Sequence, residues 1–178
     1  MIYLSEDHVY TDADGVVIPS VSQIIKDAGL ITGTDFIPEY YSDRGHRIHA
    51  SIRDKYFLGM DIEPEEDETP FLENFNHWFV KSGFEIIYCE LKGEASLNGV
   101  RFAGTMDLVG TLEGQIFIID IKNGQATKWH GIQLNGYRHI LEQDYDIQAV
   151  RLGSLHLKKE KNWLKEHPIN NSFKELLL

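Results

Sequence analysis

The sequence predicts an α/β fold in which a mixed central β-sheet is flanked by helices. Apolar residues recur with a helical period from about residue 45 to about residue 82 and with a strand period after Gly83. Three strand patterns are followed by a helical pattern and one more strand, which is the order of a mixed sheet. With 178 residues, 42% of them hydrophobic, the chain can bury one substantial core, so we expect a single domain over residues 1–178.

Residues 1–44 are expected to form a small β-hairpin and then one short helix. The hairpin turns at Asp12–Gly15, between two short apolar runs. Ser20 or Ser22 can cap the helix, and Gly29 can end it.

Residues 45–157 are expected to form the core, and residues 158–178 a basic tail. The core elements are predicted as helices over about 45–58 and 71–82, strands over 84–91, 101–112 and 115–122, a helix over about 129–142, and a strand over 149–157. The acidic stretch between the first two helices contains Pro64 and is expected to be a loop.

The charge of the chain is unevenly distributed. The net charge of -11 would repel a phosphate backbone at long range. However, residues 61–73 hold seven acids and no base, whereas residues 151–178 hold six bases and three acids. Nucleic acid therefore stays a candidate partner, with weak, salt-sensitive binding that depends on a metal or on another protein.

Several classes of protein are excluded by what the sequence lacks. Cys89 is the only cysteine, so one chain cannot build a disulfide or a cysteine-based zinc or iron–sulfur site. No run of 18 apolar residues, signal peptide or Walker-type phosphate loop occurs. We expect a cytoplasmic protein without membrane association and without a nucleotide cofactor.

The third predicted strand brings an acid and a base into an apolar run. Asp120 and Lys122 are two residues apart, so their side chains point to the same face, and Asp107 occupies the neighbouring strand. Two carboxylates that converge beside a lysine suit a hard divalent cation such as Mg²⁺. The alternative is a structural Asp–Lys salt bridge within the strand.

Together with three further segments, Asp107, Asp120 and Lys122 resemble the PD-(D/E)XK nuclease superfamily and, within it, the RecB-like exonuclease branch, which includes phage and CRISPR-associated nucleases. The five segments appear in the order and approximate spacing of that branch between Gly45 and Tyr137: Gly45-His46-Arg47-Ile48-His49, Glu90, Gly104-Thr105-Met106-Asp107, Asp120-Ile121-Lys122 and Gln133-Leu134-Asn135-Gly136-Tyr137. The resemblance implies a restriction-endonuclease-like core.

The resemblance also implies roles for individual residues. The metal ligands would be His49, Asp107 and Asp120, with the backbone carbonyl of Ile121 as a further candidate, and Lys122 would be the catalytic lysine. Glu90 would complete the acidic set. His46 competes with His49 from the preceding turn, and Glu94 competes with Glu90.

Substrate contacts follow from the same resemblance and from the positions of the bases. Gln133 and Tyr137 match a Q-x-x-x-Y element that contacts the substrate strand, and their spacing places both on one helix face. Further candidate phosphate contacts are Arg44, Arg47, Arg53, Lys128, Arg138, Lys158, Lys159, Lys161 and Lys165.

The sequence departs from the family pattern at three places. Met106 replaces the proline of the superfamily name, Asn123 stands where threonine is frequent, and the four cysteines that hold an iron–sulfur cluster in some relatives are missing. No cluster is therefore expected.

The resemblance implies a metal-dependent DNA nuclease that uses Mg²⁺ or Mn²⁺ and leaves 5′-phosphate products. We expect an exonuclease that acts on single- or double-stranded DNA ends in recombination or repair, with a phage origin and a recombination or replication protein as candidate partner. The alternatives are a catalytically inert binding module with the nuclease fold and a structure-specific or nicking endonuclease. The sequence leaves open the polarity, the choice between DNA and RNA, the number of metals and the oligomeric state.

Overall fold

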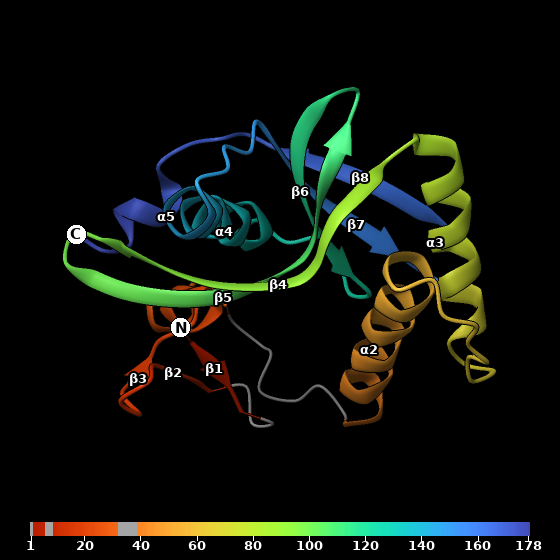
Figure 1. Cartoon of the computed structure of the whole chain (residues 1–178), viewed down its shortest axis with the longest axis horizontal. Coiled ribbons are helices and arrows are strands. Elements are labelled where there is room, and N and C mark those ends of the chain that lie inside the picture. The colour runs from red at the N-terminus through yellow and green to blue at the C-terminus, as the bar shows by residue number, and fades with distance from the viewer. Residues whose placement is uncertain (1, 6–8, 32–38) are drawn as a thin grey trace.

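A five-stranded β-sheet forms the centre of the computed structural model, which describes residues 2–5, 9–31 and 39–178 (Figure 1). The strands lie in the order β4-β5-β6-β7-β8, and their bounds are Glu85–Leu97, Val100–Leu112, Gln115–Lys122, Arg151–Leu157 and Asn162–His167. β4, β5 and β6 are antiparallel neighbours, β7 runs parallel to β6, and β8 is antiparallel to β7. The predicted mixed sheet is confirmed.

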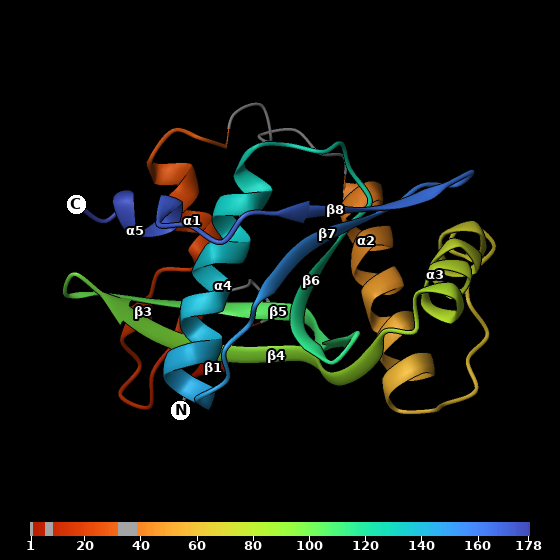
Figure 2. The same cartoon turned by 90° about the horizontal axis from the view of Figure 1, so that it is seen from above.

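Helices cover both faces of this sheet (Figures 1 and 2). One face carries α1, α4 and α5, whose bounds are Val21–Asp27, Trp129–Tyr145 and Ser172–Glu175. The other face carries α2 (Glu39–Ile52) and α3 (Thr69–Ser82), and a π-helical turn, η1 (Arg53–Phe57), continues α2. Side chains of β6 alternate between the two cores: Ile118 packs on the first, while Phe117 and Ile119 pack on the second.

A small N-terminal sheet contacts the N-terminal half of β5, around Ala103 and Thr105. Its strands β1, β2 and β3 are antiparallel, with bounds Tyr3–Leu4, Tyr10–Thr11 and Val17–Ile18. The Ala103 amide donates to the Pro19 carbonyl (3.0 Å), and the hydroxyls of Tyr10 and Thr105 lie 2.7 Å apart. The expected hairpin forms as β2 and β3, and Ser20 caps α1 by accepting from the Gln23 amide.

Two differences from the prediction have local causes. β4 continues six residues beyond residue 91. Gly93 and Ala95, which interrupt the strand pattern in the sequence, are buried and small where α4 packs closely on the strand. A Cβ atom at Gly93 would lie 2.5 Å from the Ile140 side chain, so the strand needs a residue of low β-propensity there.

The segment expected as a basic tail contains β8 and α5. β8 is an edge strand, and charged residues such as Lys165 and Glu166 are common at such edges and hide the strand pattern. In the described ranges, no helix is both long and apolar enough to cross a membrane.

Candidate metal centre

The candidate centre lies where β5 and β6 stop pairing. Their ladder runs from Leu112 and Gln115 to Leu108 and Ile119, so Asp107 and Asp120 would form the next pair. Instead, the Ile121 amide donates to the Asp107 Oδ2 atom at 2.7 Å. The Asp107 carboxylate thus replaces the next backbone acceptor. Asp107 and Asp120 both lie where the two strands separate, and we call this point the fork.

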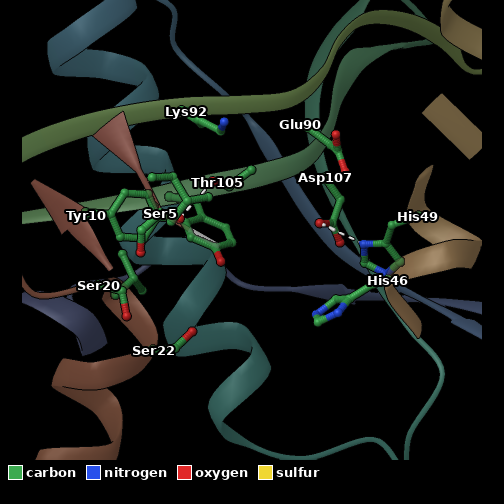
Figure 3. Close-up of a pocket in the computed structure, with 14 residues that line it drawn as sticks. Ser5, Tyr10, Ser20, Ser22, His46, His49, Glu90, Lys92, Thr105 and Asp107 are labelled. Carbon is green, nitrogen blue, oxygen red and sulfur yellow. Dashed lines mark hydrogen bonds and ion pairs between the residues drawn. The ribbon is translucent and has the colours of Figure 1, made fainter. Parts of the chain in front are cut away.

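Helix α2 brings a histidine to this fork. The Nδ1 atom of His49 lies 3.3 Å from the Asp107 Oδ1 atom (Figure 3). His46, one turn earlier on α2, lines the same pocket. Of the two histidines that the sequence offers, the structure therefore pairs His49 with the predicted carboxylate.

Lys122 is held between an acid and an amide. Its Nζ atom is 2.6 Å from Asp120 Oδ2 and donates to Gln133 Oε1 at 3.1 Å, and it lies 5.4 Å from the centre of the Trp129 ring. Asp120 is 3% exposed, and its buried Oδ2 atom is paired with this ammonium group. A divalent cation at Asp120 would therefore share the carboxylate with Lys122.

Burial and charge give the two carboxylates different proton affinities. Burial would raise the pKa of Asp107, but His49, Lys122 and the Ile121 amide outweigh it and hold that pKa below its usual value. Burial and the negative charge of Asp107 raise the pKa of Asp120 to about 6, against the opposing effect of Lys122. The pKa of His49 is raised because Asp107 outweighs the effect of burial. Asp107 is therefore the more readily ionised carboxylate of the pair, and Asp120 is the one that binds a proton more readily.

Glu90 lies on β4 directly across from Asp107. Its neighbours Cys89 and Leu91 pair with the residues on either side of Asp107, and its φ of 50° lies in the left-handed region. Its carboxylate forms an ion pair with Arg53 at 2.7 Å and lines the pocket of the centre. Glu94 instead pairs with Arg101 at 2.7 Å, so the structure places Glu90 and not Glu94 beside the candidate ligands.

The pocket at the centre has a volume of about 670 Å³ and extends to the N-terminal sheet. Figure 3 shows Glu90, Asp107, His49 and His46 on one side and Tyr10, Ser20 and Ser22 on the other. In the sequence, Ser20 and Ser22 are recognisable only as helix caps. Their position in this pocket depends on packing against segments far away in the chain, which no local sequence pattern shows.

Gln133 and Tyr137 form a buried network with Lys122. The Nε2 group of Gln133 donates to Ser22 Oγ at 2.8 Å and to the Tyr137 hydroxyl at 3.0 Å, while its Oε1 atom accepts from Lys122. Gln133 is 4% exposed. Gln133 and Tyr137 thus share one helix face, as their spacing predicts. In this structure the Gln133 amide contacts the predicted catalytic lysine.

The predicted phosphate-binding bases of the core are dispersed. Arg47 pairs with the acidic loop, where carboxylates of Glu65, Asp67 and Glu68 converge around it at 2.5–3.4 Å. Arg53 pairs with Asp54 and Glu90, Arg138 lies 3.5 Å from Glu142, and Lys128 is exposed beside Leu30 and Trp129. The structure brings only Arg53 to the centre, through Glu90. The Glu65/Asp67/Glu68 group is separate from the centre and already holds a cation, the guanidinium of Arg47.

The sequence between residues 65 and 175 matches the PD-(D/E)XK nuclease superfamily. The chain belongs to this superfamily. The matched segment contains Glu90, Asp107, Asp120, Lys122 and Gln133, whereas His49 precedes it.

Two solved structures resemble this PD-(D/E)XK chain at low identity. A protein of Eubacterium rectale named as a candidate exonuclease is 15% identical over 73% of the chain, with a TM-score of 0.46, and the chain covers 61% of that protein's length. The protein SSO0001 is 14% identical, with 88% of this chain and 81% of that chain covered and a TM-score of 0.40. No curated protein matches the sequence.

PD-(D/E)XK nucleases use divalent metal ions, and the donor set of this chain fits such an ion. Asp107 and Asp120 provide hard carboxylate oxygens from two adjacent strands, and His49 provides an imidazole nitrogen beside Asp107. The fit rests on this chemistry and on the convergence at the fork.

Proposed function

We propose that the protein is a metal-dependent deoxyribonuclease that hydrolyses phosphodiester bonds and leaves 5′-phosphate ends. The observation that carries this proposal is the convergence of His49, Asp107, Asp120 and Lys122 where β5 and β6 separate. His49, Asp107 and Asp120 would hold Mg²⁺ or Mn²⁺, with the Ile121 carbonyl as a further ligand.

When bound, the divalent cation supplies neutralisation of phosphate charge and makes the attacking water more acidic. The chain's own groups then orient the reaction. Lys122, restrained by Asp120 and Gln133, would point its ammonium group at the attacking water or at the charge that develops on the phosphate. Glu90, held by Arg53, would accept a hydrogen bond from the water or complete a second metal site.

We further propose exonuclease action on DNA ends in recombination or repair, in a phage-encoded protein of the host cytoplasm. This finer assignment is supported by the five sequence segments that resemble the RecB-like branch, from Gly45 to Tyr137.

The test is digestion of linear and covalently closed circular plasmid with Mg²⁺, Mn²⁺ or EDTA. We expect the linear plasmid to be degraded with either metal and left intact with EDTA. The variant Asp120→Asn should lose at least 100-fold in rate, because a metal ligand is removed. Glu113→Gln is the matched control, since Glu113 lies in the turn at the other end of β5 and β6 with its side chain 80% exposed.

Each outcome separates one alternative. Full activity of Asp120→Asn, or no activity of the wild type with any metal, would overturn the proposed function. Nicking of the circular plasmid would indicate an endonuclease. Absence of cleavage of labelled single-stranded DNA, double-stranded DNA and RNA, together with absence of Mn²⁺ binding that depends on Asp107 and Asp120, would indicate an inert binding module.

A further inference from the structure

A second cleft lies among the first turns of α2 and α3, the end of β6 and the loop after β7. It has a volume of about 550 Å³, and we call it the basic cleft; its lining residues are Tyr40, Tyr41, Arg44, Phe71, Asn123, Lys158 and Lys159. Three of these side chains are cationic, and none of the described residues that line the cleft is acidic. In a chain with a net charge of -11, this is a local reversal of sign.

The positive charge of Arg44 is held in place by aromatic rings. Its guanidinium carbon lies 4.8 Å from the ring centre of Phe71, 5.1 Å from that of Tyr41 and 5.5 Å from that of Tyr40. Aromatic faces orient a cation but leave its charge in place. Arg47 on the same helix forms direct ion pairs with the acidic loop. That loop meets the cleft through Asp67, which accepts a hydrogen bond from the Tyr40 hydroxyl at 2.6 Å and lies in the field of Arg44. Arg44 therefore presents a positive charge that Asp67 offsets in part, and its buried Nε group has no hydrogen-bond partner in the described residues.

The loop after β7 carries the other two cations. Lys158 donates from Nζ to the Asn123 carbonyl at 2.8 Å, and the Asn74 side chain donates to the backbone carbonyls of Lys158 and Lys159. The loop is thereby anchored through its backbone, while the lysine side chains remain at the cleft. The Oδ1 atom of Asn123 is buried and lacks a hydrogen-bond partner in the described part of the chain. Buried polar atoms without partners are rare in folded proteins, so this acceptor is expected to receive a hydrogen bond from water or from a donor group of a base bound in the cleft.

The basic cleft adjoins the metal centre. Asn123 directly follows Lys122, and a Cβ atom at Gly45 would lie 3.6 Å from the Asn123 side chain. Along α2, Arg44 precedes His49 by five residues, a rise of about 7.5 Å. A polynucleotide bound at the centre would therefore have a neighbouring nucleotide within reach of the cleft.

We propose that the basic cleft binds an unpaired nucleotide of the substrate strand next to the cleaved bond; this inference rests on the proposed nuclease function. Arg44, Lys158 and Lys159 contact the phosphate. Tyr40 and Tyr41, whose residues are 54% and 53% exposed, offer ring surfaces on which the base stacks. The combination of fixed cations with exposed aromatic faces is that of a single-strand binding surface, so the protein prefers a single-stranded or frayed end.

The test is fluorescence anisotropy of a labelled 12-nucleotide oligo(dT) and of a blunt 12-base-pair duplex, measured in EDTA so that no cleavage occurs. The cleft variant carries Arg44→Gln, Lys158→Gln and Lys159→Gln. The matched control carries Lys55→Gln, Lys81→Gln and Lys174→Gln, which remove the same charge from exposed positions elsewhere. We expect the cleft variant to bind oligo(dT) at least tenfold more weakly and the control less than threefold more weakly. The slope of log affinity against log salt should fall by up to about 2 in the cleft variant.

A second variant, Tyr40→Ala with Tyr41→Ala, keeps the number of cations but removes two of the three rings around Arg44, and it should weaken oligo(dT) binding at least fivefold. Photocrosslinking of an oligonucleotide that contains 5-iodouracil should place the adduct on one of these tyrosines in the wild type. Equal losses in the cleft and control variants, or no loss with the tyrosine variant and adducts elsewhere, would overturn the proposal. These readouts need no catalysis, so a failure of the nuclease assay and a failure of the cleft proposal are distinguishable.

Discussion

Substitution of Gln133 by leucine should slow cleavage without weakening metal binding. Gln133 is the amide that restrains the Lys122 ammonium from the side opposite Asp120, at 3.1 Å. A hydrogen bond to a charged group contributes about 1.5–3 kcal/mol. If this bond holds Lys122 in its reactive position, its loss lowers kcat by a factor of roughly 10 to 150.

The assay is single-turnover cleavage of a linear duplex at saturating metal, together with Mn²⁺ titration and thermal unfolding of the same samples. The matched variant is Gln133→Glu, which retains an oxygen acceptor for Lys122 and can accept hydrogen bonds from Ser22 and Tyr137. We expect Gln133→Glu to recover most of the rate. A rate for Gln133→Leu within threefold of the wild type, or a loss of Mn²⁺ affinity equal to the loss in rate, would refute the role of Gln133 as a positioning residue.

Three further predictions concern the fold and its titrating groups. Gly136→Ala should lower the free energy of unfolding by about 1–3 kcal/mol in urea titrations, since the added Cβ atom would lie 2.7 Å from Val21 and this overpacking exceeds the gain in helix propensity. Burial, with the charges of Glu90 and Asp107, raises the pKa of Cys89 to about 12, so iodoacetamide at pH 8 should alkylate the native thiol at least 100-fold more slowly than the unfolded one. Burial and the charge of Lys122 lower the pKa of His130 to about 3. Below pH 6.5 the unfolded state binds a proton that the folded state does not, so the free energy of unfolding should fall by about 2 kcal/mol between pH 7 and pH 5. In urea titrations, His130→Gln should remove this pH-dependent loss.

Side-chain alternation along one strand was enough to predict part of the centre. Asp120 and Lys122 do share a face and do form the ion pair that was considered as the purely structural alternative. The alternation could not show that β5 and β6 stop pairing at this point, because that depends on how the longer β4–β5 ribbon continues toward the N-terminal sheet.

The surroundings of the centre were harder to predict, because they depend on contacts between distant segments. Arg47 lies two residues before His49 on α2 and so is a candidate for a substrate contact, but carboxylates of the acidic loop about 20 residues later form ion pairs with it. Ser22 reads as a helix cap until α1 is packed beside α4, where it becomes a partner of Gln133. A local pattern contains neither relationship.

The separation of β5 from β6 also has a mechanical consequence. Asp107 belongs to the two-stranded ribbon of β4 and β5, while Asp120 belongs to the block of β6, β7 and β8. The backbone ladder between the two halves ends just before these residues, and beyond it the hydrogen bond from the Ile121 amide to the Asp107 carboxylate joins them, so bending of the ribbon against the block would change the separation of the two carboxylates. An ion held by both carboxylates would restrain the ribbon against the block. Loss of the ion would make the sheet more flexible at the place where the substrate enters and the product leaves.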